Sequence, residues 1–286
     1  DHGVTYITQA PAHFQDMLAV PEDGRPHCGS LQQVLLTGAT SAPHLRSAVC
    51  ELFPSARVFD VYGSTEAGLI TMLLPKHLQD KPGSVGRETP GTFPCCIVDT
   101  ETGEDVPQGQ RGLIMVRTPM MFSGYWRRPD LPAPDPTTGY FPQGDVGFRD
   151  NDGFLHLCGR ADDMITTALG ANIFPAEVES LLSGAWGVQE AILFGLPHNR
   201  AAARLTIAVI LNSSESTRPG CDAHEQLARE VADRLRHVSQ YKRPGTCLFL
   251  ASTGIPRTAN GKLMRSRLCE HITAELEFRA NHERDG

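Results

Sequence analysis

The stretch from Gly139 to Ile165 reads G-Y-F-P-Q-G-D-V-G-F-R-D-N-D-G-F-L-H-L-C-G-R-A-D-D-M-I. Two alternating apolar runs flank D-N-D-G, and an Asp-Gly pair supplies the positive φ angles that a tight hairpin turn needs. Such a hairpin would bring Asp145 and Arg160 to the same end of a small sheet. The following G-R-A-D-D has no apolar anchor, and a new apolar strand starts at Met164 and Ile165. The stretch therefore predicts a strand pair that leads into a pivot between two domains.

On its own, the pair of charges at Asp145 and Arg160 has a second interpretation, a surface ion pair that contributes little to stability. The hairpin alone does not distinguish a surface ion pair from a pair with a function, so the motifs outside the hairpin are needed.

Composition limits the class of protein. A chain of 286 residues is long enough for two domains of about 150 residues each. A formal net charge of −7 and an isoelectric point near 5.9 argue against a nucleic-acid or anionic-membrane surface. No apolar run approaches the roughly 18 residues that span a bilayer, and the chain does not start with a signal peptide. We therefore expect a cytoplasmic protein without a membrane span.

The eight cysteines show neither C-x-x-C spacing nor an accompanying histidine pattern, so the sequence predicts free thiols and no zinc site. The chain enters a strand directly after Asp1-His2-Gly3, without an initiating methionine. We therefore expect a fragment.

The first part of the chain alternates strands and helices. A strand over residues 4–8, a helix from Pro11 to about residue 20, and a strand over Gln33–Leu36 lead to T-G-A-T-S-A-P. An amphipathic helix and a strand over Arg57–Val61 then lead to Y-G-S-T-E-A-G. This rhythm predicts a parallel α/β sheet, which binds ligands at the carboxyl ends of its strands.

The two glycine-containing turns carry the candidate ligand contacts. Gly38 and Ala39 would let a flat ring approach the backbone closely, and Tyr62 offers an aromatic face. Thr65 offers a hydroxyl, and Glu66 offers a carboxylate suited to a hard cation such as Mg²⁺. The alternative is a plain strand-to-helix turn capped by Thr65 and Glu66.

The first helix carries His13, which either lines a ligand pocket or belongs to the core, and the spacing alone favours the core.

Residues 82–125 form short strands between glycines and predict a small β-rich layer. After the pivot, the pattern is that of a compact α+β unit, with a helix from Pro175, strands over Val188–Phe194, Leu205–Leu211 and Thr246–Leu250, and a helix from Asp222. I-P-R-T-A-N-G-K-L-M-R and a last helix follow. The predicted fold class is therefore α/β: part of a large N-terminal parallel-sheet domain with a small β-layer (1–161), then a compact α+β C-terminal domain across a hinge (162–286).

Five motifs now stand in order: T-G-A-T-S-A-P, Y-G-S-T-E-A-G, Gly144-Asp145, G-R-A-D-D and P-R-T-A-N-G-K-L-M-R. Together they resemble the adenylate-forming superfamily of acyl- and aryl-CoA synthetases, luciferases and the adenylation domains of peptide synthetases. The resemblance covers nearly the whole chain, but only about the C-terminal half of a complete family member, and so implies a missing N-terminal half.

The resemblance implies an ATP site. In it Gly38, Ala39 and Tyr62 would hold the adenine, with Leu157 closing over it. The remaining implied contacts are Thr65 on the α-phosphate, Glu66 on Mg²⁺, Asp145 on both ribose hydroxyls and Arg160 beside the sugar.

The resemblance also implies a two-step reaction with a domain rotation between the steps. Lys262 would stabilise the transfer of adenylate from ATP to a carboxylic acid, an electrostatic role. The C-terminal domain would then rotate about Asp162 and bring Gly170 to the path of an incoming thiol, that of CoA or of a carrier-protein phosphopantetheine. The pocket for the acid, which is possibly aromatic, would include His13 and the region of Gly63.

The sequence departs from the family pattern at several points. The Ser/Thr/Gly-rich phosphate loop with its lysine is absent from these residues, Gln143 replaces a threonine, Leu113 a glutamate, and Ala202-Ala203 a Gly-Glu or Gly-Gln pair. G-Y-W-R-R-P-D, the first helix and P-R-T-x-x-G-K favour an acid–CoA ligase. An adenylation enzyme that loads a carrier protein, and a catalytically silent adenylate-binding remnant, stay as alternatives.

Overall fold

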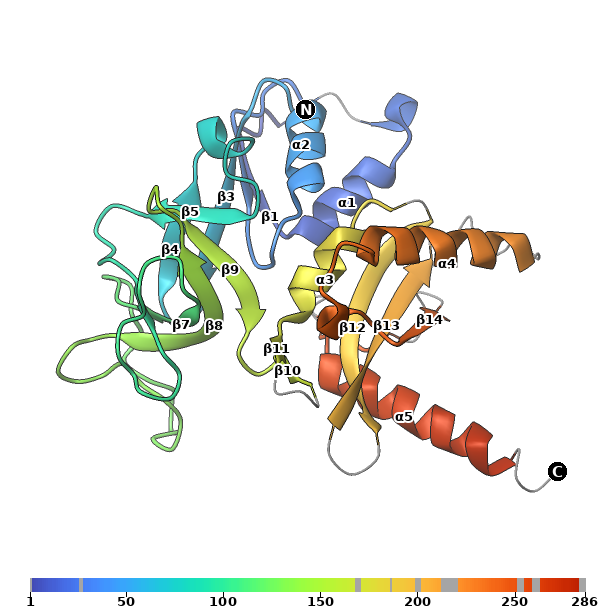
Figure 1. The fold of residues 1–286 in the computed structure, drawn as a ribbon. Helices are drawn as coiled ribbons and strands as arrows, with labels where there is room; N and C mark the ends of the chain where they lie inside the picture. Colours follow the sequence, from blue (N-terminus) through green and yellow to red (C-terminus); the bar gives the residue numbers. More distant parts are fainter. Residues whose placement is uncertain are drawn as a thin grey trace. The chain divides into compact units, whose positions relative to one another are not determined.

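The computed structural model describes residues 2–25, 28–167, 171–185, 187–198, 202–211, 221–250, 255–258 and 263–282. The chain divides into two compact units, Asp1–Ala161 and Asp162–Gly286 (Figure 1). No described helix has the length and the apolar character needed to cross a membrane.

The first unit is built on one mixed sheet. Its strands lie in the order β1-β2-β3-β4-β5-β9-β8-β7-β6. Only β1, β2 and β3 are parallel to one another, and each later pairing is antiparallel. The bounds are β1 (Tyr6–Gln9), β2 (Gln33–Leu36), β3 (Arg57–Ser64), β4 (Gly68–Leu73), β5 (Ser84–Glu88), β6 (Cys96–Val98), β7 (Gly112–Val116), β8 (Phe141–Arg149) and β9 (Leu155–Arg160).

The expectation of a parallel sheet is therefore correct for the three strands that it named, and the sheet continues beyond them in antiparallel pairings. After β3 the chain turns tightly at residues 65–67 and returns as β4, so Y-G-S-T-E-A-G is a hairpin turn and not a strand-to-helix turn. The β-rich layer is continuous with the large sheet, because β5 pairs with β9 through Ser84 and His156.

Two helices pack against the parallel part of the sheet (Figure 1). α1 (Pro11–Ala19) and α2 (Pro43–Leu52) both carry proline in the first turn, where a missing N–H costs no helical hydrogen bond. Each buries one apolar stripe against the strands. The shared core comprises Phe14, Leu45 and Val49 from the helices and Val34, Leu36 and Val58 from the strands. Two 3-10 turns, η1 (Glu22–Gly24) and η2 (Pro75–His77), lie in the connections.

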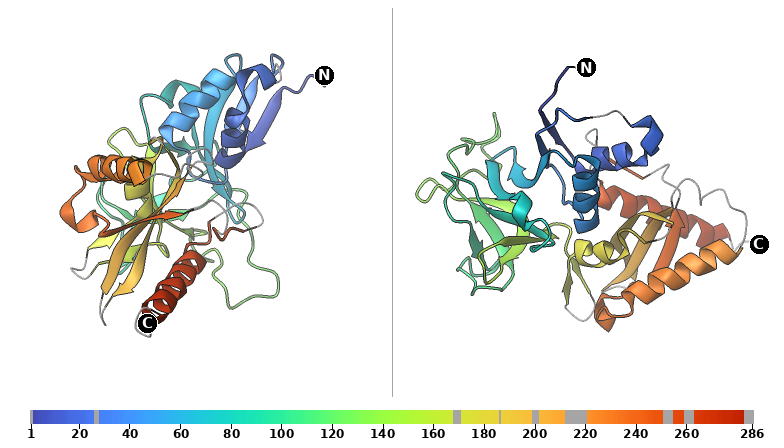
Figure 2. Two further views of the ribbon diagram at one scale, coloured as in Figure 1. Left: turned by 90° about the vertical axis from the view of Figure 1, so that its right-hand side faces the viewer. Right: turned by 90° about the horizontal axis from the view of Figure 1, so that it is seen from above.

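The second unit contains a three-stranded sheet with helices on both faces (Figure 2). β12 (Val188–His198) is antiparallel to β13 (Ala202–Leu211), which is parallel to β14 (Thr246–Leu250). Neighbouring residues alternate between the faces: Leu193 packs with α3 (Pro175–Leu182) and α4 (Cys221–Leu235), while Ile192 packs with α5 (Arg265–His282). A small pair, β10 (Ile165–Thr166) and β11 (Asn172–Ile173), and the turn η3 (Gln240–Lys242) complete the unit.

Candidate functional site

Three polar side chains from three strands meet in the first unit. The Tyr62 hydroxyl, on β3, donates to Asp145 Oδ2 on β8 at 2.7 Å, and Arg160 Nη1 on β9 lies 3.3 Å from Asp145 Oδ1. In the sheet β3 and β8 are separated by β4, β5 and β9, so at about 4.8 Å a strand the sheet must curl to bring them into contact. Curling thus brings together a polar group that no single strand contains.

The backbone of Gln143-Gly144-Asp145 accommodates the Arg160 side chain. Gly144 has φ +73°, which strains any other residue, and a Cβ there would lie 2.7 Å from Arg160 Nη2, so a side chain would displace the guanidinium. Arg160 Nη1 also donates to the Gln143 carbonyl at 2.6 Å. Because this acceptor is a backbone atom, the Gln143 side chain is not needed to hold Arg160. Its buried Nε2 has no hydrogen-bond partner among the described residues.

The Tyr62 hydroxyl acts here as a hydrogen-bond donor. Burial, and then the Asp145 carboxylate, raise the pKa of Tyr62 well above its usual value, so the phenol stays protonated. Each Asp145 oxygen therefore accepts one bond from the protein and keeps lone pairs for other donors. The Asp145 side chain is 18% exposed, which leaves it open to a ligand.

The turn between β3 and β4 presents Thr65 and Glu66 beside this group. Thr65 is exposed, and Glu66 Oε1 accepts the Tyr125 hydroxyl at 2.6 Å. That bond lowers the pKa of Glu66, and the nearby Arg160 acts in the same direction. The backbone of the turn is held by the segment around Phe122, whose N–H donates to the Glu66 carbonyl at 2.7 Å. Glu66 is therefore an ionised, oriented carboxylate.

Gly63 sets the geometry of the same turn. The register of β3 and β4 shifts between Tyr62 and Gly63, and a Cβ on Gly63 would lie 2.3 Å from the Gly68 carbonyl oxygen. Any side chain at this position would push the turn away from β4.

The T-G-A-T-S-A-P segment follows β2 and exposes Gly38 and Ala39, with Gly38 at φ +87°. Beneath it lies a buried ion pair that the sequence analysis missed: Arg46 Nε donates to Asp60 Oδ2 at 2.6 Å. Burial raises the pKa of Asp60, although Arg46 opposes the change. Arg46 Nη2 also donates to the Ser84 carbonyl at 3.1 Å, which ties α2 to β3 and β5. The signal in the sequence was an aspartate inside the apolar run V-F-D-V-Y.

Comparison with protein-family models gives two matches in chain order. The model described as AMP-binding enzyme matches residues 1–126, and that of the AMP-binding enzyme C-terminal domain matches residues 177–262. The chain belongs to the adenylate-forming superfamily.

Relatives of the chain support the same family. A feruloyl-CoA synthase of an Amycolatopsis species is 32% identical over 266 residues, 93% of this chain and 51% of the relative. A fatty acid–[acyl-carrier-protein] ligase of Streptomyces coeruleorubidus is 28% identical over 289 residues, 98% of this chain and 52% of the relative. The solved structure of an anthranilate CoA ligase with anthranoyl-AMP superposes with a TM-score of 0.80 at 27% identity, over 96% of this chain and 51% of that one. The chain spans about half the length of these relatives.

The structure places the remaining predicted site residues as follows. Leu157 is partly buried against the cluster that contains Tyr62. His13 is exposed on α1 and its neighbour Phe14 is fully buried, so the interpretation of His13 as a core residue is wrong. Asp162 is exposed at the start of the second unit. Lys262 and Gly170 lie outside the described residues.

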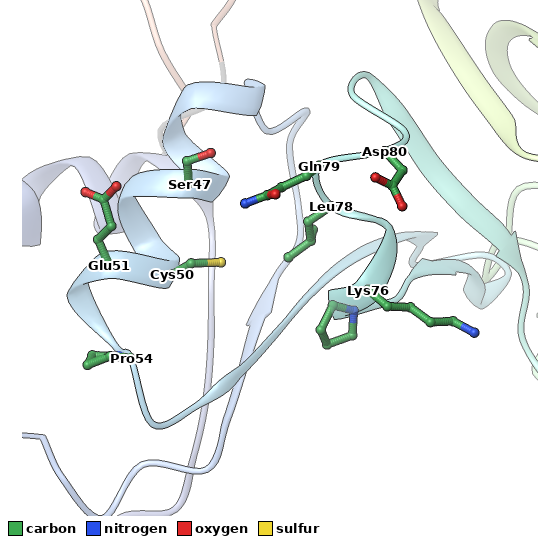
Figure 3. Close-up of a pocket in the computed structure, with 9 residues that line it drawn as sticks. Ser47, Cys50, Glu51, Pro54, Lys76, Leu78, Gln79 and Asp80 are labelled. Atoms are coloured by element: carbon green, nitrogen blue, oxygen red, sulfur yellow. The ribbon is translucent and has the colours of Figure 1, made fainter.

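An open cavity lies elsewhere in the described part of the first unit. It has a volume of ≈ 620 Å³ and lies between α2 and η2, with Cys50 and Gln79 among its lining residues (Figure 3). None of the residues of the polar site lines it, and we assign it no ligand. The described residues also contain no cluster of three or more His, Cys, Asp or Glu that would hold a metal by itself. A cation at Glu66 would therefore need phosphate oxygens and water as further ligands.

Proposed function

We propose that this chain carries the adenylate site of an AMP-forming acid–CoA ligase. The observation that supports it most directly is the group of Tyr62, Asp145 and Arg160 beside the oriented carboxylate of Glu66, in a chain of the adenylate-forming family. Residues 1–161 then correspond to part of the large adenylate-binding domain, and residues 162–286 to the small mobile domain.

The nucleotide contacts follow from the chemistry of the site. Asp145 would accept both ribose hydroxyls through its free lone pairs, with Arg160 beside the sugar. Gly38, Ala39 and Tyr62 would enclose the adenine, with Leu157 at its edge. The buried Nε2 of Gln143 is a donor left over for a polar ligand, so the residues present fit a nucleotide.

Two bond-forming steps make up the proposed reaction. An oxygen of the acid attacks the α-phosphorus of ATP, and the bond to pyrophosphate breaks. A thiol sulfur then attacks the acyl carbon, its proton is lost, and the acyl–oxygen bond to AMP breaks. Lys262 and Thr65 would stabilise the charge on the α-phosphate in the first step.

Glu66 would supply one carboxylate ligand to Mg²⁺, which when bound neutralises phosphate charge. Tyr125 holds that carboxylate in place from the protein side. In the second step, a rotation about Asp162 would withdraw Lys262 and bring Gly170 to the path of the thiol.

The proposed substrate is a small carboxylic acid, and an aromatic one is favoured. Two of the similar proteins are a feruloyl-CoA synthase and an anthranilate CoA ligase. His13 is exposed on α1, and Gly63 lies on an exposed part of β3, so both are free to line a pocket.

The second candidate function differs in the acceptor. A relative is a fatty acid–[acyl-carrier-protein] ligase, and Ala202-Ala203 depart from the pattern of the thiol-side residues. We propose free CoA as the acceptor and phosphopantetheine on a carrier protein as the alternative.

The test is ATP–pyrophosphate exchange by the complete protein with a panel of aromatic and aliphatic acids. The proposal expects acid-dependent exchange, strongest with one chemical class, followed by thioester formation with CoA. Thioester formation with a carrier protein and not with CoA would favour the second candidate. Absence of exchange with every acid, in a protein shown to bind AMP, would leave only a silent adenylate-binding protein.

A further inference from the structure

The segment that follows β7 is fastened along the turn between β3 and β4. The buried Thr118 hydroxyl donates to the Ala67 carbonyl at 2.6 Å, and the Phe122 N–H donates to the Glu66 carbonyl at 2.7 Å. These two bonds fix consecutive peptide groups of the turn. The same segment then brings the Tyr125 hydroxyl to Glu66 Oε1, at 2.6 Å. The segment after β7 therefore holds both the backbone and the carboxylate of Glu66.

Tyr125 is the outer member of a row of three aromatic rings. Its ring meets Phe122 edge to face with centroids 5.0 Å apart, and Phe122 meets Phe141 in the same way at 5.0 Å. Edge-to-face contacts favour one relative orientation of the rings. Phe141 is buried on β8, the strand that also carries Asp145, so the row rests on the sheet. Tyr125 is 39% exposed, yet the row holds its hydroxyl beside Glu66.

The bond to Tyr125 makes the two oxygens of Glu66 unequal. A carboxylate that binds a cation through both oxygens needs both of them turned toward the cation. Oε1 already accepts a short, charge-assisted bond from a hydroxyl that the aromatic row holds in place. Turning Oε1 toward a cation would stretch or break that bond, whereas Oε2 can serve as a ligand without disturbing it. Glu66 is therefore oriented to bind a cation through one oxygen.

Cations differ in how they use a carboxylate. Ca²⁺ takes about six to eight oxygens at about 2.3–2.6 Å and accepts both oxygens of one carboxylate. Mg²⁺ is smaller, requires octahedral geometry at about 2.0–2.1 Å, and keeps several waters. In a shell that otherwise consists of phosphate oxygens and water, a carboxylate that offers one oxygen suits Mg²⁺ and deprives Ca²⁺ of a ligand. The orientation of Glu66 therefore bears on which cation is bound.

We propose that Tyr125 determines the cation preference of the site: by holding Oε1, it limits Glu66 to one ligating oxygen and favours Mg²⁺ over Ca²⁺. The inference rests on the proposed function, in which Glu66 is a ligand of the nucleotide-bound cation. Tyr125 is a positioning residue, because it acts on the cation through Glu66 and does not ligate it.

The test is calorimetric titration of the complete protein with ATP, without an acid substrate, in saturating Mg²⁺ and again in saturating Ca²⁺. Tyr125→Phe removes one hydroxyl and keeps the ring in its row, so the fold should be retained, which circular dichroism checks. We expect the ATP affinity in Mg²⁺ to fall by roughly 10-fold, because a group that orients a metal ligand has been removed. The affinity in Ca²⁺ should change by less than about threefold, because Glu66 is then free to use both oxygens.

The matched control is Tyr140→Phe. The Tyr140 hydroxyl donates to the Pro94 carbonyl at 2.9 Å, so this variant also loses one tyrosine hydroxyl bond in the first unit and keeps the bond between Tyr125 and Glu66. Its ratio of ATP affinities in Mg²⁺ and Ca²⁺ should equal that of the unsubstituted protein. Three results would overturn the proposal: equal losses in both cations for Tyr125→Phe, no loss in either, or the same change of ratio in Tyr140→Phe.

Glu66→Gln separates this inference from the proposed function. Glutamine keeps the size of Glu66 without its charge, so Mg²⁺ should increase the ATP affinity of this variant much less than that of the unsubstituted protein. If Glu66→Gln responded fully to Mg²⁺, Glu66 would not be the cation ligand, and that part of the proposed function would fail together with the inference. If Glu66→Gln lost the response while Tyr125→Phe kept its preference for Mg²⁺, the proposed function would stand and the inference alone would fail.

Discussion

At the scale of single residues, Asp145 connects the candidate site, because it bonds to both Tyr62 and Arg160. An exposed ion pair with Arg160 alone would contribute little, as the simplest interpretation of the sequence held. The structure instead gives Asp145 a second donor, the buried Tyr62 hydroxyl, and packs Arg160 against Gly144. The carboxylate is thereby held in one orientation with lone pairs still free, which is what recognition of a diol requires.

Asp145→Ala should weaken AMP binding far more than Tyr62→Phe. The first change removes two charge-assisted bonds to the ribose, each worth about 1.5–3 kcal/mol, which corresponds to two to four orders of magnitude in affinity. The second removes the same Tyr62–Asp145 bond but leaves the carboxylate, so we expect less than a tenfold loss. Isothermal titration calorimetry with AMP measures both. Equal affinities for the two variants would contradict the assignment of Asp145 to the ribose.

Asp150 should make the first unit sensitive to acid. Burial by itself would raise its pKa, but bonds from the Phe154 N–H, Lys81 and His156 outweigh burial and lower the pKa to about 2 from 3.8. Because the folded-state pKa is the lower one, the stabilisation is present above about pH 4 and is lost as the pH falls toward 2.

Asp150→Asn should therefore lower the free energy of unfolding by about 1 kcal/mol at neutral pH, once solvent screening is allowed for. The loss should become smaller as the pH falls from about 4 toward 2. Urea denaturation at several pH values measures the difference. Asp152→Asn is the control, since Asp152 also pairs with Lys81 but its side chain is 66% exposed. If the difference in unfolding free energy between Asp150→Asn and the unsubstituted protein did not change with pH, the stabilisation would not come from the lowered pKa of Asp150.

At the scale of secondary-structure elements, local signals predicted well and long-range pairings did not. The hairpin of β8 and β9 was predictable because its turn chemistry lies within it, and Gly153 has φ +80° as the Asp-Gly turn required. β4 was not predicted, because an apolar run such as G-L-I-T-M-L shows no periodicity that separates a strand from a buried helix. Its antiparallel pairing with β3 is decided by the turn at residues 65–67.

Gly63→Ala should disrupt that turn. The added Cβ would meet the Gly68 carbonyl oxygen at 2.3 Å, so β3 and β4 must separate. We expect a loss of about 1–3 kcal/mol in the free energy of unfolding, together with weaker nucleotide binding through displaced Thr65 and Glu66. Gly24→Ala is the control, because its Cβ would meet only Val20 Cγ1, at 3.4 Å. Similar unfolding midpoints for the two variants would show that the turn adapts to a side chain.

At the scale of the whole molecule, the order of the motifs was enough to predict the family and the fold class. The candidate site needed more, because the curl of the sheet and the buried Arg46–Asp60 pair join residues that are far apart in the sequence. Contacts of this kind produce no periodic pattern in the sequence. The roles of Lys262 and Gly170 stay predictions from the resemblance.

Lys262 and Gly170 should divide the two half-reactions in the complete protein. Lys262→Ala should lower adenylation by roughly 10²–10³-fold, by analogy with the loss of one transition-state donor, and spare thioester formation from supplied acyl-AMP. Gly170→Leu should do the reverse by blocking the path of the thiol. Rapid-quench measurement of each half-reaction tests this. Parallel losses in both variants would argue against a rotation between two active arrangements.

Residues 1–286 expressed by themselves should bind acyl-AMP weakly and fail to exchange pyrophosphate into ATP. The developing charge of the leaving pyrophosphate needs backbone donors and a cation nearby, and the two glycine-containing turns are already assigned to adenine and to Glu66. An exchange assay on a species of verified mass decides the point. Steady exchange would show that the leaving pyrophosphate is held by residues of this chain.

The pairing of β5 with β9 has a consequence for the order in which the first unit folds. Its partners, Ser84 and His156, are far apart in sequence, whereas β8 and β9 form a local hairpin. Closing a long stretch of chain is entropically costly and comes late, so the hairpin should form early and dock on β5 as a preformed unit. Tyr62 is on β3, outside the hairpin, and Asp145 is on β8, within it. The two residues therefore meet only after the hairpin has docked, and the site forms last. A nucleotide added during refolding should then leave the folding rate unchanged and slow only unfolding.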